Sequence, residues 1–135
     1  MLQLVYISSA RPGIAVEDVR NILSTSRARN AGDRVTGVLV FNGKRFLQAL
    51  EGDPSAVEAA FTRIRADDRH RAVVKLSERQ VEAREFGDWA MASCEVAGHG
   101  NQAAMIETVD ALVAKVPDAN TRETFRSFVR IARAA

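Results

Sequence analysis

Two polar residues, Tyr6 and Gln48, lie within apolar segments whose composition is typical of buried strands. An unpaired polar group in such a strand costs about 1–3 kcal/mol, so each side chain needs a partner. A primary amide both donates and accepts hydrogen bonds, so Gln48 can bridge a tyrosine hydroxyl and a heterocycle with a carbonyl group and a ring nitrogen. The pair therefore has the chemistry to recognise a ligand. The alternative is that Gln48 bonds only to the backbone and that Tyr6 only fills the core.

Five strands are predicted to position this pair. They come from short apolar runs over residues 2–7, 35–41, 46–50, 72–76 and 89–96. Asn42 and Gly43 join the second and third strands, because this dipeptide tolerates the positive φ angles of a tight hairpin. A polar stretch, residues 77–88, separates the last two strands. Tyr6 and Gln48 fall in the first and third strands.

Two helices alternate with these strands. The first is predicted from residue 16 to about residue 28, with residues 30–33 as its stop. The second runs to Ala66, with Asp53 as N-cap and Pro54 as its first residue. The order strand, helix, strand, strand, helix, strand, strand predicts an α+β fold. We expect a ferredoxin-like split βαβ sheet that carries both helices on one face.

The other face of this sheet needs a cover or a partner. Two further helices are predicted over residues 102–115 and 121–133, and Asn120 with Glu123 is the expected cap of the second. Their apolar residues suit packing onto the exposed sheet face or against another chain. We therefore expect a domain over residues 1–97 and a two-helix extension over residues 98–135.

Composition and motifs exclude several classes of function. The net charge of +2 is too small to indicate a nucleic-acid or membrane-surface protein, so neither partner is expected. One cysteine, Cys94, and two histidines cannot form an intramolecular disulfide or the usual structural zinc site. The sequence has no dinucleotide-binding, phosphate-loop, zinc-protease or serine-elbow motif. Without a membrane-spanning run or a secretory leader, a cytoplasmic location is expected.

Six segments together carry a more specific pattern than any one of them. They are Tyr6 in the first strand and residues 26–30 (SRARN), 35–39 (VTGVL), 46–52 (FLQALEG), 67–70 (DDRH) and 86–91 (FGDWAM). In this order and at these spacings they resemble the BLUF family, the sensors of blue light that use flavin. The resemblance covers about residues 2–95.

The resemblance implies a cofactor and a photochemical mechanism. An FAD ring would sit noncovalently between the two helices, with Asn30 and Gln48 hydrogen-bonded to its polar edge. Tyr6 would donate an electron and a proton under blue light, and the Gln48 amide would end rotated or tautomerised. A stronger hydrogen bond to the flavin carbonyl would then give a small, reversible red shift.

Further cofactor contacts follow from the same resemblance. They are implied for Ser26, Arg29, Arg63, Asp67, Arg69 and His70, several of them around the ribityl chain and the far edge of the flavin. Each charged member of this set also suits a solvated surface position, and Asn30 also suits the stop of a helix.

Trp89 and Met91 are the expected signal relay. They lie two residues apart on one predicted strand, so both side chains point to the same face and only one can readily lie near Gln48. The alternative is a packed core pair. The signal would leave through the last strand and the C-terminal helices, by a change in a homo-oligomer or in a separate protein partner.

The residues after Val96 are too few for a cyclase or phosphodiesterase domain, so a short, stand-alone, non-enzymatic photosensor is expected. Two other classes stay open. One is a light-independent module that binds flavin or another small molecule, and the other is a structural interaction protein. A flavin enzyme is less favoured, because the sequence shows neither a nicotinamide site nor a cluster that would polarise a substrate.

Overall fold

The computed structural model describes residues 1–41, 44–86, 92–95 and 102–131. The predicted Asn42–Gly43 turn and the predicted relay residues Trp89 and Met91 lie outside the described residues. The elements in chain order are β1 (Leu2–Ala10), α1 (Val16–Asp33), β2 (Thr36–Phe41), β3 (Arg45–Gly52), α2 (Pro54–Ala66), β4 (His70–Gln80), β5 (Ala92–Glu95), α3 (Gln102–Val113) and α4 (Ala119–Ile131).

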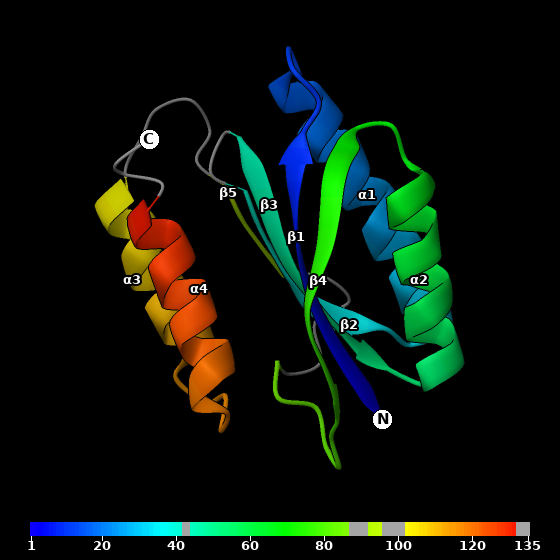
Figure 1. The fold of residues 1–135 in the computed structure, drawn as a ribbon, viewed down its shortest axis with the longest axis vertical. Coiled ribbons are helices and arrows are strands. Elements are labelled where there is room, and N and C mark those ends of the chain that lie inside the picture. The colour runs from blue at the N-terminus through cyan, green and yellow to red at the C-terminus, as the bar shows by residue number, and fades with distance from the viewer. Residues whose placement is uncertain (42–43, 87–91, 96–101, 132–135) are drawn as a thin grey trace.

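The strands form one sheet in the order β4-β1-β3-β2-β5. β1 pairs antiparallel with β3 and β4, β2 pairs antiparallel with β3, and β5 lies parallel to β2. Helices α1 and α2 cover one face, and α3 and α4 lie on the other (Figure 1). This arrangement confirms the predicted α+β split βαβ fold.

The sheet separates two hydrophobic cores because successive residues of a strand point to opposite faces. In β1, Leu4 and Tyr6 belong to the core under α1 and α2, whereas Val5 belongs to the core under α3 and α4. Val109 of α3 and Phe125 of α4 lie in the second core and are buried there. The C-terminal helices therefore pack onto the sheet face that the sequence left in need of a cover.

Two predicted helix boundaries were wrong. α1 continues through Asn30 to Asp33, because the left-handed residue that ends it is Arg34, with φ 57°. Asn30 is thus a residue of the last turn, and its carbonyl accepts a hydrogen bond from the Val35 N–H at 2.8 Å. At α4, Asp118 rather than Asn120 is the cap. Its carboxylate accepts hydrogen bonds from the Thr121 N–H at 2.9 Å and the Thr121 hydroxyl at 2.7 Å.

The edge strand β4 is longer than predicted. Residues 77–80, expected in a polar connection, extend the strand because they pair with residues 2–5 of β1. An edge strand accepts polar side chains readily, since one of its sides faces solvent. The α2 boundaries, with Asp53 before Pro54 and Ala66 at the end, are as predicted.

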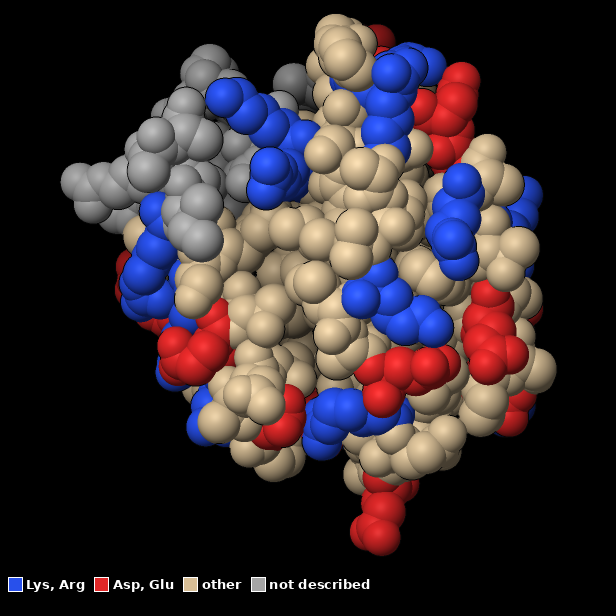
Figure 2. Space-filling model, in the orientation of Figure 1, with Lys and Arg blue, Asp and Glu red and all other residues tan. Residues whose placement is uncertain are grey.

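One part of the α3–α4 face stays open. Val74 and Leu76 of β4 are 52% and 46% exposed. Leu76 lines a cavity of about 570 Å³ together with Leu47 of β3 and Phe128 of α4. Figure 2 shows a hollowed, mainly uncharged surface in the centre of this view, with charged side chains around it. The C-terminal helices therefore leave the β4 side of this face accessible.

No helix among the described residues is long and apolar enough to cross a membrane.

The close packing of β2 against β3 can be tested at Gly37. A methyl group at Gly37 would lie 1.9 Å from the Ala49 carbonyl oxygen, whereas one at Gly32 in α1 would meet nothing within 4 Å. Gly37→Ala should lower the free energy of unfolding by about 1–3 kcal/mol or more, because the strand must shift. Gly32→Ala, the matched control, should raise it by up to about 1 kcal/mol, because alanine favours the helix. Urea denaturation measures both changes, and equal stability of the two variants would contradict the proposed close approach.

Candidate functional site

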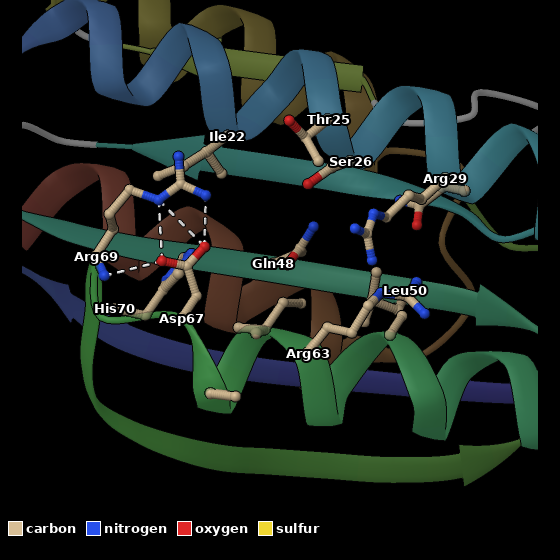
Figure 3. A pocket seen from close by; sticks show the side chains of 14 residues that line it. Ile22, Thr25, Ser26, Arg29, Gln48, Leu50, Arg63, Asp67, Arg69 and His70 are labelled. Carbon is tan, nitrogen blue, oxygen red and sulfur yellow. Dashed lines mark hydrogen bonds and ion pairs between the residues drawn. The ribbon is translucent and has the colours of Figure 1, made fainter.

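A cavity of about 370 Å³ lies between α1 and α2, with β3 as its floor (Figure 3). Its volume falls in the usual range for small-molecule sites. The lining residues are Ile22, Thr25, Ser26, Arg29, Asn30, Gln48, Leu50, Ala60, Arg63, Ile64, Ala66, Asp67, Arg69 and His70.

Secondary-structure periodicity places these residues around one space. On α1, Ser26, Arg29 and Asn30 follow the i, i+3, i+4 spacing of one helix face. α2 contributes a second face at the same spacing, with Ala60, Arg63 and Ile64. On β3, Gln48 and Leu50 are two residues apart and point to the same side of the sheet.

The structure brings together all the charged and polar residues for which flavin contacts were expected, apart from Tyr6. Ser26, Arg29, Asn30, Gln48, Arg63, Asp67, Arg69 and His70 all line the cavity. Tyr6 lies beside Gln48 in the first core and does not line the cavity. Sequence reasoning missed the apolar part of the wall, Ile22, Leu50, Ala60, Ile64 and Ala66, and also Thr25. The apolar residues are spaced like ordinary core residues, so the sequence carried no separate signal for them.

Tyr6 and Gln48 are direct cross-strand neighbours in the β1–β3 ladder. Tyr6 is fully buried, and its hydroxyl donates a hydrogen bond to Gln48 Oε1. This bond fixes the orientation of the amide. Figure 3 shows the Gln48 nitrogen directed into the space between α1 and α2. One strand pair thus carries a phenol in the core and an amide on the cavity wall.

The environment keeps Tyr6 protonated. Burial raises the pKa of Tyr6 far above its ordinary value, and the negative charge of Asp67 raises it further. The Phe61 ring lies 5.6 Å from the Tyr6 ring, and the His70 ring lies 6.3 Å from it (centroid to centroid). The phenol is therefore a hydrogen-bond donor at every ordinary pH.

Asp67 and Arg69 form an ion pair at one end of the cavity. Arg69 Nη2 lies 2.6 Å from Asp67 Oδ2, Arg69 Nε lies 2.9 Å from Asp67 Oδ1, and the Arg69 N–H donates to the same Oδ1 at 2.9 Å. These hydrogen bonds lower the pKa of Asp67 and, in return, raise the pKa of Arg69. Both groups stay charged, and the fork geometry holds the turn between α2 and β4.

A second, weaker ion pair links the two helices. Arg63 of α2 lies 3.5 Å from Asp33 at the end of α1, and both side chains are about as exposed as an ordinary surface pair. Such pairs contribute only about 0–1 kcal/mol to stability. Here the ion pair joins α2 to the end of α1 and so helps to position Arg63, which lines the cavity.

His70 is held by a polar and an aromatic contact. Its Nδ1 lies 2.9 Å from the Ser8 hydroxyl, and its ring centroid lies 4.6 Å from that of Phe46. Burial lowers the pKa of His70 to about 4; Asp67 opposes this shift and Arg69 adds to it. His70 is therefore neutral at neutral pH.

Comparison with known proteins identifies the family to which this site belongs. The sequence model described as "Sensors of blue-light using FAD" (BLUF) matches residues 1–92. The chain belongs to the BLUF family. Its members sense blue light with a bound flavin, and this identification confirms the family predicted from the six sequence segments.

Two curated relatives illustrate the range of BLUF proteins. The blue light- and temperature-regulated antirepressor BluF of Escherichia coli is 31% identical over 129 residues, which are 93% of this chain and 32% of the relative. The photoactivated adenylate cyclase subunit alpha of Euglena gracilis is 33% identical over 87 residues, 64% of this chain and 8% of the relative. The chain thus spans a third or less of these relatives' lengths.

Solved BLUF structures share the whole arrangement. The dark-state structure of the BLUF protein BlrB matches with a TM-score of 0.72 and 29% identity, covering 99% of this chain and 96% of BlrB. A Klebsiella pneumoniae BlrP1 structure matches with a TM-score of 0.79 and 28% identity, over 96% of this chain and 33% of BlrP1. Another BlrP1 structure, 25% identical, contains FMN. The C-terminal helices therefore belong to the compared fold as well.

The burial of His70 predicts a pH dependence of stability in this BLUF chain. Since the pKa of His70 falls from 6.5 to about 4 on folding, the unfolded chain binds the proton more tightly. Stability should be complete above the unfolded pKa and should fall as the pH drops toward about 4, by at most about 3 kcal/mol. Urea denaturation across this range should show a smaller loss for His70→Gln. An equal loss in the variant would mean that other groups cause the pH dependence.

Proposed function

We propose that this BLUF chain binds FAD noncovalently in the cavity between α1 and α2 and uses Tyr6 and Gln48 as its photochemical switch. The observation that carries the proposal is the buried hydrogen bond from the Tyr6 hydroxyl to Gln48 Oε1, with the amide on the cavity wall. This bond gives a protonated phenol a direct path to a group that contacts the ligand.

The chemistry of the cavity wall fits a flavin ring. Asn30 and Gln48 are each only 3% exposed and present amide groups that can both donate and accept, as the carbonyl and N–H groups of the ring edge require. Ile22, Leu50 and Ile64 supply apolar surface that suits the ring faces. We assign the ring edge to the two amides.

The charged residues of the cavity fit the polar chain of the cofactor. Arg29, Arg63 and Arg69 line the same cavity and can donate to the hydroxyl and phosphate oxygens of an FAD side chain. Ser26 and Asp67 add a hydroxyl and a carboxylate to this wall, and His70 adds a neutral imidazole. These six residues are our candidates for contacts beyond the ring edge.

The protein environment controls how Tyr6 would donate its electron and its proton. A bound flavin would supply the chromophore that absorbs blue light and the acceptor for an electron from Tyr6. Burial disfavours both the phenolate anion and the tyrosyl cation, so the electron and the hydroxyl proton of Tyr6 should leave together. The proton already lies on a hydrogen bond to Gln48 Oε1, which therefore receives it.

The Gln48 amide would then keep a changed set of hydrogen bonds. An amide protonated at its oxygen can rotate, or it can lose a proton from its nitrogen and so become its tautomer. Rotation exchanges the groups that face Tyr6 and the cavity, whereas tautomerisation leaves them in place and exchanges their donor and acceptor roles. When the proton and the electron return to Tyr6, the altered hydrogen bonds of Gln48 remain. The cofactor ends chemically unchanged, and the light signal is a rearranged amide.

The output follows from the second core. We propose a photosensory domain over residues 1–97 and an output extension over residues 98–135, without catalysis of its own. A light signal would pass through the segment that contains Trp89 and Met91 to α3 and α4, and would alter a homo-oligomer or a separate protein partner. The packing of α3 and α4 on the opposite face of the sheet supports this route.

The photochemical assignment is tested by Tyr6→Phe and Gln48→Leu. Both variants should keep bound flavin and lose the light-induced red shift, because one lacks the proton donor and the other lacks the amide. Gln80→Leu, at the exposed end of β4, is the matched control and should shift as the parent protein does. Absorption spectra of dark and illuminated protein, followed through recovery, measure the shift.

The outcomes separate the competing functions. A full red shift in Tyr6→Phe contradicts the donor assignment. Flavin without any shift in the unaltered protein would indicate a light-independent binding module, and a chain that takes up no flavin would have no photosensory role.

The identity of the cofactor needs its own measurement. Acid denaturation of the purified protein should release the flavin, because the proposal includes no covalent bond. Chromatography of the released material should then show FAD, whereas predominant FMN or riboflavin would contradict this part of the proposal. Flavin that stays with the precipitated chain would contradict noncovalent binding.

A further inference from the structure

Glu51 of β3 is a fully buried carboxylate, with 0% exposure. Its Oε2 accepts hydrogen bonds from the Glu85 N–H at 2.8 Å and from Gln3 Nε2 at 2.9 Å, and its Oε1 accepts one from the Phe86 N–H at 2.9 Å. A buried hydrogen-bond donor or acceptor that loses its partner keeps its desolvation cost, so these bonds are costly to break. Glu51 therefore binds the backbone at residues 85 and 86 to the sheet.

Side chains around Glu51 form a hydrogen-bonded network with it. Arg79 Nη1 donates to Gln3 Oε1 at 2.9 Å and lies 3.0 Å from Glu85 Oε1. Gln3 Nε2 also donates to Glu85 Oε1 at 3.0 Å. The network thus joins β1, β3 and β4 to residues 81–86. A connected, partly buried polar network of this kind favours one arrangement of its members.

Arg84 makes a second attachment from the same segment. Its Nη1 donates to the Thr36 hydroxyl at 2.6 Å and to the Glu51 carbonyl at 2.9 Å, and its Nη2 donates to the Arg34 carbonyl at 2.7 Å. Residues 81–86 are therefore held by side-chain and backbone groups of β3 and of the α1–β2 junction.

The Glu51 network shares its two strands with the photochemical pair. Tyr6 pairs with Gln48 and Gln3 pairs with Glu51 in the same β1–β3 register. The pairs lie three residues apart, so they point to opposite faces of the sheet. A displacement of β3 against β1 at Gln48 would also displace Glu51, because residues 48–51 of β3 all pair with β1.

Beyond Glu51, the contact continues to the C-terminal helices. Phe86 is buried in the second core, and its ring centroid lies 5.5 Å from that of Phe125 in α4. Glu51 thus holds the N–H of the residue whose side chain packs against α4. Strand β3, the Glu51 carboxylate and the contact between Phe86 and Phe125 thus connect the cavity to α4.

We propose that Glu51 is a positioning residue for the light response: it holds the Glu85 and Phe86 amides in the dark and releases them when the Gln48 hydrogen bonds rearrange. This inference rests on the proposed roles of Tyr6 and Gln48. Release of the two amides would loosen Phe86 from β3 and change its packing against Phe125.

Hydrogen exchange of the flavin-bound full chain tests the proposal directly. In the unaltered protein, the amides of Glu85 and Phe86 should exchange slowly in the dark and faster under blue light. In Glu51→Gln at least one of these two amides should exchange fast in both conditions, because glutamine keeps one acceptor oxygen whereas the two amides use one oxygen each. Flavin binding and the red shift should remain, since the variant leaves Tyr6 and Gln48 intact.

The lifetime of the shifted state gives a second readout that a purely structural role would not move. Glu51→Gln should recover in the dark about tenfold more slowly, because it loses hydrogen bonds that favour return to the dark arrangement. Glu82→Gln is the matched control. It makes the same substitution at an exposed position of the same segment and should recover like the parent protein.

The possible results distinguish this proposal from the photochemistry. A red shift with equal exchange of both amides in dark and light overturns the role of Glu51, as does identical recovery of Glu51→Gln and Glu82→Gln. Absence of any red shift in the parent protein overturns the Tyr6–Gln48 assignment, on which this inference rests.

A second variant tests the route to α4 independently of whether Glu51→Gln folds. Phe86→Leu keeps the backbone amides and the Glu51 carboxylate but removes the ring contact to Phe125. It should keep the light-dependent exchange at residues 85 and 86 and lose it in α4. An unchanged light response of α4 would contradict transmission through Phe86.

Discussion

The register of β1 against β3 is the constraint on which the site depends. Tyr6 opposes Gln48 and Gln3 opposes Glu51 in this antiparallel ladder. Because side chains alternate between faces, a slip of one residue would move Tyr6 out of the first core and turn Gln48 away from the cavity. The apolar residues of the same strands, which fill both cores, make such a slip costly. The hydrophobic effect therefore fixes the geometry of a polar pair.

The two faces of the sheet meet different physical demands. The α1–α2 face must leave a cavity and still satisfy buried polar groups, so Tyr6 bonds to Gln48 and His70 to Ser8. On the opposite face, α3 and α4 pack mainly aliphatic and phenylalanine side chains against the sheet and leave only the β4 side accessible. The walls of a cavity lack partner atoms on one side, and a ligand can supply these packing contacts. This division explains why the polar site residues gather on one side.

Local patterns in the sequence predicted most of the fold, and tertiary contacts explain where prediction failed. Strand alternation, the Asp53–Pro54 start of α2 and the order of elements were sufficient for the split βαβ sheet. The end of α1 was wrong because Arg34, a residue with no special preference for positive φ, takes the left-handed conformation there. Tyr6 and Gln48 were predicted as polar residues within apolar strands, and the other polar site residues were predicted through the family resemblance. The partners of Glu51 were not, because two of them are backbone amides whose positions no side-chain pattern reveals.

In a sensor of this architecture, a change at the cavity has to be transmitted across the sheet to the C-terminal helices. Its cavity lies on one face and its C-terminal helices on the other, so no helix on the cavity side touches the second core directly among the described residues. A strand can serve both faces, because consecutive side chains of one backbone reach opposite sides. β3 has Gln48 on one side and Glu51 on the other, and under the proposed mechanism the hydrogen bonds at both positions would have two alternative arrangements rather than deform continuously. The polar residues of β3 are thus better suited to carry a signal than the apolar residues that surround them.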